Sequence, residues 1–94
     1  MSREEVYYPT KLERSEVYKI IDTERDYQDA NSNNWNHVGK PTVEAEILMM
    51  EEYLARARSA WVNNNGKDAA LDMMRKVVGI AVRCFENHGV NPRN

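Results

Sequence analysis

The stretch ALDMMRKVVGIAVRCF, residues 70–85, carries two apolar stripes side by side at the spacing of an α-helix. Residues three or four positions apart share one face of a helix, and the alternation typical of a β-strand is absent from this stretch. A helix that is apolar over so wide an arc has to be covered on both sides. We expect one stripe to face the preceding helix and the other to face the first helix or another subunit. The stripes are Leu71, Met74, Val78, Ala81 and Phe85, and Ala70, Met73, Val77, Ile80 and Cys84.

Signals at both ends predict that this helix spans residues 69–88. Asp68 has a side chain of the type that caps helix N-termini, and the Asn-rich run with a glycine before it is typical of a break. Gly89 is expected to end the helix in the left-handed αL conformation, and Pro92 follows, as is common after a helix.

A second helix is predicted immediately before this one, over residues 43–62. Thr42 is its expected N-cap, and acidic residues follow in the first turn, where the helix dipole favours them. Glu52 and Arg56 have the spacing of an i,i+4 ion pair. The apolar residues of this helix repeat in a heptad pattern. They are Val43, Ile47, Met50, Leu54, Ala57 and Trp61.

A leading helix is predicted over residues 11–30. Thr10 and Glu13 have the spacing of a capping box, in which each side chain satisfies a free N–H at the start of the helix. Arg25 and Asp29 have the spacing of a further i,i+4 pair. A run of Asn and Ser then ends the helix, because such side chains compete for backbone hydrogen bonds. The apolar residues lie roughly on one face, and they are Val17, Ile20, Ile21 and Tyr27.

Together these signals predict a single all-α domain over residues 1–94, with a short leading helix followed by an antiparallel helical hairpin of helices 43–62 and 69–88. Residues 1–19 form a leader and the start of the first helix. A chain this short buries only about 60–65% of the surface that its unfolded form exposes. Five Met and one Phe also leave few rigid core fillers. We therefore expect the domain to bury more surface by assembling into a homo-oligomer.

The charge balance and the cysteine content limit the classes of function. The 13 basic and 15 acidic residues give a net charge of −2 without a basic block, whereas polymeric DNA or RNA needs clustered cations. Cys84 is the only cysteine and cannot form a disulfide within the chain. Neither a signal-peptide pattern nor a long apolar run is present. We expect a cytoplasmic protein that binds neither nucleic-acid polymers nor membranes.

Residues 24–42, ERDYQDANSNNWNHVGKPT, combine aromatic, basic and amide side chains at a helix end and the following loop. Tyr27, next to Gln28, is placed to stack on a planar base, a contact worth about 1–3 kcal/mol. Lys40 and Thr42 precede a helix N-terminus, whose free N–H groups and positive potential suit a phosphate. The alternative for these two residues is a helix cap with a solvated lysine.

The other reactive side chains form no catalytic or zinc-binding pattern in the sequence, so we assign no catalytic residue and no metal ligand. Arg83 lies between apolar stripes and must reach a carboxylate, an anion or water, and a structural ion pair is the favoured alternative to ligand binding. Trp35 fits the edge of a core better than a ligand site. His37 and His88 fit polar loop or cap positions, and Cys84 lies on an apolar face.

Paired acidic residues leave one class of enzyme open. Nucleoside triphosphate pyrophosphohydrolases of the MazG type hold magnesium with paired glutamates on facing helices, in a pattern close to EExxE followed by ExxD. Ala55 stands where the third glutamate of that pattern is needed, and magnesium requires several oxygens at one point. We expect a protein without enzymatic activity and keep the pyrophosphohydrolase as the alternative. The acidic pairs are Glu13 and Glu16, Glu51 and Glu52, and Asp68 and Asp72.

Short motifs along the chain resemble a family of small phage proteins. The motifs are ERxYQD at residues 24–29, Trp35, the segment Ala55–Trp61, and RKxxxxAVRCxENHG at residues 75–89. The family is that of anti-CBASS protein 2, phage sponges that sequester the cyclic oligonucleotide signals made by bacterial immune cyclases. The resemblance does not extend to residues 1–19.

This resemblance implies a compact homohexamer that needs no cofactor and acts in the cytoplasm of an infected bacterial host. It implies that Tyr27 stacks on a base of a cyclic dinucleotide and that Lys40 and Thr42 hold a phosphate. It also implies a second type of site, for cyclic trinucleotides, that uses Gln28 and Arg83. Such a protein captures the signal without cleaving it and so opposes CBASS-type defence.

Overall fold

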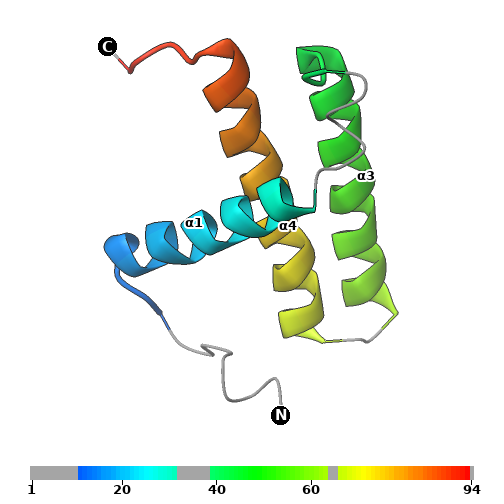
Figure 1. Ribbon diagram of the computed structural model, residues 1–94. Coiled ribbons are helices and arrows are strands. Elements are labelled where there is room, and N and C mark those ends of the chain that lie inside the picture. The colour runs from blue at the N-terminus through cyan, green and yellow to red at the C-terminus, as the bar shows by residue number, and fades with distance from the viewer. Residues whose placement is uncertain (1–10, 32–38, 64–65, 94) are drawn as a thin grey trace.

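The computed structural model describes residues 11–31, 39–63 and 66–93, and these residues form three α-helices and no strand. The helices are α1 (Arg14–Ala30), α3 (Val43–Val62) and α4 (Lys67–His88) (Figure 1). The predicted all-α class is therefore confirmed. Helix α4 packs against both other helices, whereas α1 and α3 do not pack directly against each other within the described ranges.

Capping residues determine where α3 and α4 begin and where α4 ends. The hydroxyl oxygen of Thr42 accepts a bond from the N–H of Ala45 at 3.1 Å, which confirms the predicted N-cap of α3. Helix α4 begins earlier than predicted, because Gly66 and not Asp68 is its N-cap; its φ of 97° suits glycine alone among common residues. Gly89 does end α4, but its φ of 88° and ψ of 172° differ from the expected αL conformation.

Helix α1 begins later than the predicted residue 11 and ends at the predicted residue 30. Thr10, the predicted cap, lies outside the described residues. The capping box forms one turn further on, where the carboxylate of Glu16 accepts a bond from the N–H of Glu13 at 3.1 Å. At the other end, the side-chain amide of Asn31 donates to the carbonyl of Tyr27 at 2.8 Å. The backbone N–H of Asn31 also donates to this carbonyl, at 3.1 Å, and these bonds confirm that asparagine ends the helix.

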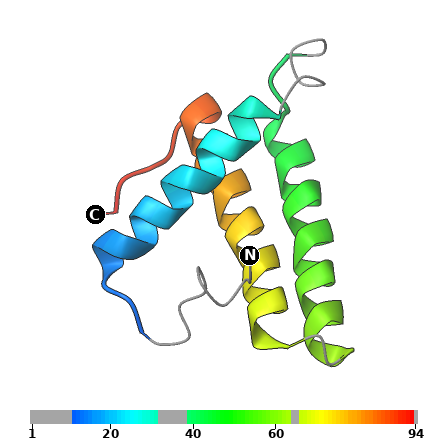
Figure 2. The ribbon, with the colours of Figure 1, turned by 60° about the horizontal axis from the view of Figure 1, so that its bottom comes forward.

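The core is thin and lies where α4 meets the other two helices (Figures 1 and 2). Its buried apolar residues are Ile21 of α1, Ala57 of α3, and Ile80 and Cys84 of α4. Ile80 and Cys84 belong to one of the two apolar stripes predicted for α4, and Met73 of the same stripe lines a cavity together with residues of α3. The prediction that one stripe packs on the preceding helix is therefore confirmed.

The second apolar stripe of α4 remains exposed, because α1 covers a different face of α4. Four of its side chains are more than 40% exposed. The heptad stripe of α3 is also largely exposed, and of its residues only Ala57 is buried. Gly79 of α4 and Met49 and Tyr53 of α3 lie on the side of α1, and at about 100° per residue the two exposed stripes point away from these positions. We call this surface the outer face; it consists of Val43, Ile47, Leu54, Trp61, Leu71, Met74, Val78 and Phe85.

Helix α1 crosses α4 at Gly79, a buried position without a side chain. A Cβ atom added there would lie 2.7 Å from the Nε2 of Gln28 and 2.7 Å from the Cγ of Glu24. Both distances are shorter than any ordinary contact between such atoms. The close approach of α1 therefore depends on the glycine, and with it the position of every side chain that α1 presents toward α3.

Ion pairs fasten α1 to α4 on either side of this crossing. The Nε of Arg25 donates to Glu86 at 2.6 Å, and the Nε of Arg75 donates to Glu24 at 2.8 Å. The bond to Glu86 is the main cause of the raised pKa of Arg25. Burial acts to lower the pKa of Arg75, but its hydrogen bonds to Glu24 and Asp72 outweigh this and raise it.

Both predicted ion pairs within a helix also form, which confirms the i,i+4 spacing arguments. Arg25 donates to Asp29 at 3.0 Å, and Arg56 donates to Glu52 at 3.1 Å. The second pair is exposed on both sides, so it contributes no more than about 0.3–0.5 kcal/mol. The contacts that position α1 are therefore those that reach across to α4.

Acid is expected to weaken the docking of α1 through Glu86. The bond from Arg25 lowers the pKa of Glu86 below its ordinary value of 4.5, so the pair stabilises the folded state above that pH. This stability is lost as the pH falls through the lowered pKa. Urea unfolding of the protein and of Glu86→Gln, between about pH 6 and about pH 3.5, should show a stability difference that shrinks in acid. A difference that is constant with pH would contradict this linkage.

Candidate functional site

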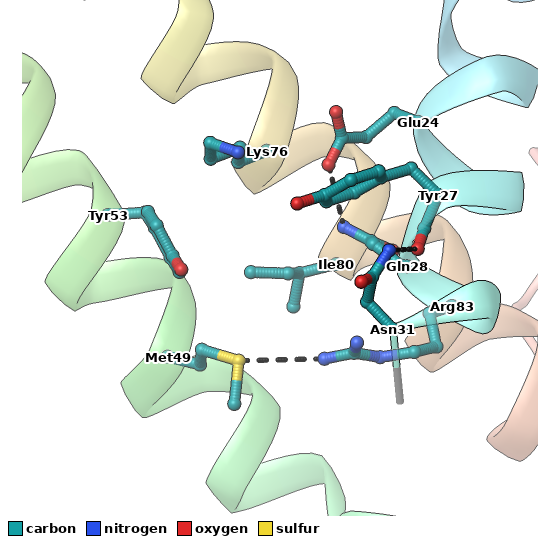
Figure 3. Close-up of a pocket in the computed structure, with 9 residues that line it drawn as sticks. All are labelled: Glu24, Tyr27, Gln28, Asn31, Met49, Tyr53, Lys76, Ile80 and Arg83. Carbon is teal, nitrogen blue, oxygen red and sulfur yellow. Dashed lines mark hydrogen bonds between the residues drawn. The ribbon is translucent and has the colours of Figure 1, made fainter. Parts of the chain in front are cut away.

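A pocket of about 140 Å³ lies between α1 and α3, with α4 as its floor (Figure 3). It exists because α4 packs against both helices while α1 and α3 stay apart. Typical small-molecule sites have volumes of roughly 300–1,000 Å³, so this one encloses a fragment of a ligand rather than a whole one. Its lining residues are Glu24, Tyr27, Gln28, Asn31, Met49, Tyr53, Lys76, Ile80 and Arg83.

Two aromatic side chains stand on opposite walls of the pocket. Tyr27 projects from α1 and Tyr53 from α3, with the buried side chain of Ile80 between them on the floor (Figure 3). Tyr27 is 59% exposed, so it is not a core residue of the described fold. An exposed ring beside an apolar floor offers a planar group a surface on which to stack.

Hydrogen bonds to charged neighbours hold the side chain of Gln28 in place on the α1 side of the pocket. The side-chain amide of Gln28 donates to Glu24 at 3.4 Å, and its oxygen accepts a bond from the Nη1 of Arg25 at 3.1 Å. Glu24 in turn accepts the bond from Arg75. These contacts orient Gln28 next to Tyr27 and bond the carboxylate of Glu24 to an arginine.

Arg83 forms a buried ion pair with Glu46 under the pocket. Its Nε and Nη2 donate to the two carboxylate oxygens at 2.8 Å and 2.6 Å, and Nη2 also lies 3.5 Å from the sulfur of Met49. Glu46 is 0% exposed. The ion pair favoured for Arg83 in the sequence is therefore confirmed. The charge of Arg83 is balanced within the protein, although the side chain still lines the pocket.

Lys76 is the cation of the pocket whose charge is not balanced in this way. Its Nζ lies over the ring of Tyr27, 5.7 Å from the centroid, and no ion pair joins it to a carboxylate among the described residues. A cation–π contact of this kind is worth about 0.5–1 kcal/mol when exposed. Because Glu24 and Glu46 are each bonded to an arginine, Lys76 is the pocket cation placed to meet an anionic group of a ligand.

Lys40 and Thr42 do not line this pocket. Both are exposed at the start of α3, and the Oγ1 of Thr42 is already used in capping the helix. The Nε2 of His88 lies 2.8 Å from the carbonyl oxygen of Pro41, which ties this segment to the end of α4. The predicted site residues therefore divide into two places, with Tyr27, Gln28 and Arg83 together in the pocket.

The sequence reasoning missed the residues that complete the pocket. Lys76 and Ile80 precede Arg83 by seven and three residues, so all three lie on one face of α4. Helical spacing from Arg83 could therefore have indicated the other two. Tyr53 carried no such signal, because its place opposite Tyr27 depends on how α3 packs against α4. Trp35 and His37, which belonged to the candidate stretch, lie outside the described residues.

The acids of the alternative enzyme do not gather in one place within the described ranges. No group of three or more His, Cys, Asp or Glu side chains there is arranged to hold a metal ion. Glu52 is paired with Arg56, and Asp72 with Arg75. Cys84 is buried, and no described helix combines the length and apolar character needed to cross a membrane.

Comparisons with known protein families, with curated proteins and with solved structures found no match to this chain.

Proposed function

We propose that this protein binds cyclic dinucleotides, and cyclic trinucleotides as well, and sequesters them without cleavage. The observation that supports this most is the pocket between α1 and α3, where Tyr27, Gln28 and Arg83 meet. An aromatic plate, an oriented amide and the lysine of α4 that lines the pocket suit a ligand with flat bases and a few phosphates. Capture of such a signal would lower its free concentration and oppose CBASS-type defence in the cytoplasm of an infected bacterial host.

In this proposal the binding residues have distinct roles. Tyr27 stacks on one base, and Gln28 bonds to its edge or to a sugar. Lys40 and Thr42 hold a phosphate at the start of α3, where the N–H groups of the first turn point outward. Arg83 contributes to the binding of cyclic trinucleotides. For this, part of its guanidinium has to bind the ligand while Glu46 accepts hydrogen bonds from the other part.

The proposed assembly is a homo-oligomer, with a hexamer as the expected state. The outer face supports self-association, because its apolar side chains on α3 and α4 are exposed in a single copy. Its exposed large side chains would be covered if the predicted antiparallel hairpin packed against another copy of itself. Light scattering tests this, and a clean monomer at working concentration would contradict it.

The function is tested by capture and release. The purified protein is incubated with a panel of cyclic and linear nucleotides, separated from free ligand and denatured, and the released molecules are chromatographed. Recovery of intact cyclic nucleotide supports the sponge. Release of pyrophosphate and a monophosphate from a triphosphate, dependent on magnesium, would support the pyrophosphohydrolase instead. No retained ligand would favour a helical adaptor and reject both.

Replacement of Tyr27 separates stacking from hydrogen bonding. Tyr27→Phe keeps the ring and should keep most of the affinity for a cyclic dinucleotide, whereas Tyr27→Ala should lose about 1–3 kcal/mol. The melting temperature should change little in either variant, because the side chain is 59% exposed. Calorimetry and a melting curve on each variant provide the measurement. Unchanged affinity of Tyr27→Ala would remove this ring from the site.

A further inference from the structure

The lysine beside the ring of Tyr27 is Lys76, to which the sequence motifs assigned no role. Lys76 rises from the middle of α4 into the pocket, half-buried, with its ammonium over the ring of Tyr27 (Figure 3). Lys40 lies at the start of α3 and does not line the pocket. A phosphate attached to a nucleoside whose base stacks in the pocket is therefore within reach of Lys76 first.

The charges around the pocket leave this role to Lys76. Glu24 is bound by Arg75 at 2.8 Å, and Glu46 is bound by Arg83 at 2.6 Å. Each of these two carboxylates thus already bonds to an arginine, and Lys76 has a ring rather than a carboxylate beside it among the described residues. An ammonium held by a ring exchanges that contact readily for a phosphate, because a charge-assisted hydrogen bond is the stronger interaction.

The shape of the pocket limits what can enter it. Its volume of about 140 Å³ lies well below that of a site for a whole cyclic dinucleotide. Tyr27 and Tyr53 face it from opposite walls, and Ile80 forms the floor (Figure 3). A space of this size suits one planar base rather than two, and Lys76 lines it together with both rings.

We propose that the pocket is a subsite for a single nucleotide unit, in which a base lies between Tyr27 and Tyr53 and Lys76 binds the attached phosphate. The assignment rests on the proposed function for the nucleotide nature of the ligand. It goes further in two respects. The recognised unit is one nucleoside monophosphate, and its phosphate is bound by Lys76 of α4 rather than by Lys40.

The test compares adenosine with adenosine 5′-monophosphate, which differ only in the phosphate. Both are titrated into the full chain and into Lys76→Gln, which removes the charge and leaves a polar side chain one atom shorter. Affinity is followed by NMR through the ring signals of Tyr27 and Tyr53. Lys67→Gln is the matched control, because Lys67 is an exposed lysine of the same helix that does not line the pocket.

Lys76→Gln should weaken binding of the monophosphate by roughly 10- to 150-fold, the loss expected for one charge-assisted contact. Binding of adenosine should be the same in both proteins, and Lys67→Gln should behave like the unchanged chain. Equal losses for adenosine and the monophosphate, or an equal loss in Lys67→Gln, would overturn the assignment. So would ring signals of Tyr27 and Tyr53 that do not respond to adenosine.

A cyclic dinucleotide titrated in parallel distinguishes failure of this assignment from failure of the proposed function. Equal retention of the cyclic dinucleotide by the unchanged chain and by Lys76→Gln would overturn the role of Lys76 while the sponge function stands. Binding of the monophosphate through Lys76 without any binding of cyclic nucleotides would support the subsite and reject the sponge. Absence of binding for every nucleotide would overturn both.

Discussion

Replacing Glu46 by Ala is expected to lower the free energy of unfolding by about 3–5 kcal/mol, the largest effect of any single change considered for this protein. Glu46 is 0% exposed and receives two hydrogen bonds from Arg83, at 2.6 Å and 2.8 Å. Its removal leaves a buried guanidinium without its carboxylate. Since small domains are stable by only about 5–15 kcal/mol, this loss brings the chain close to unfolding. Urea unfolding at neutral pH measures it.

A second variant shows whether loss of the ion pair is the cause. In Glu46→Leu combined with Arg83→Met, both charges are replaced by apolar side chains, and such replacements are often neutral or stabilising. The double variant should therefore recover most of the stability that Glu46→Ala loses. A double variant as unstable as Glu46→Ala would assign the loss to packing rather than to charge, and a cost below about 1 kcal/mol for Glu46→Ala would show that the pair is hydrated.

Gly79→Val is expected to displace α1 and to remove ligand binding together with stability. The new Cβ would lie 2.7 Å from the Cγ of Glu24, an atom near the backbone whose carboxylate is tied to Arg75. Overpacking of this kind costs about 1–3 kcal/mol, and valine regains little of it through helix propensity. Tyr27 moves away with α1, so affinity for a cyclic dinucleotide should fall with the melting temperature.

Ala81→Val is the matched control for this change. Ala81 lies two residues further along α4, on the stripe that faces away from α1, so the same β-branched side chain is added without meeting α1. It should melt and bind much as the unchanged chain does. A Gly79→Val protein with normal melting and normal affinity would show that α1 can dock without the close approach at Gly79.

Much of the local structure could be predicted, because it depends on neighbours in the chain. Thr42 caps α3 through a residue three positions away, and Asn31 ends α1 through a carbonyl four positions away. The error at the start of α4 has the same local origin: Asp68 and Gly66 both suit a helix start, and the positive φ of Gly66 decided between them.

The candidate site was predicted in part. Tyr27 and Gln28 were indicated by their place at a helix end, and both line the pocket with Arg83. Lys40 was indicated by a local motif, yet it lies away from this pocket. Tyr53 and Lys76 were assigned no role, although Lys76 lies within the motif at residues 75–89, because neither residue stands out from the pattern of its own helix.

The sequence by itself determined that the chain is all-helical, where its helices end to within a few residues, and which faces of them are apolar. These properties follow from spacing along the chain, which is a local quantity. Only the tertiary structure decided which apolar stripe is buried, how α1 crosses α4 at Gly79, and that the pocket combines side chains of all three helices. The physical reason is that α4 has more apolar surface than one neighbour can cover. The part of that surface that each helix covers depends on how closely the two backbones can approach, as at Gly79, and on ion pairs between residues far apart in the sequence. The pair of Arg25 with Glu86 is one of these.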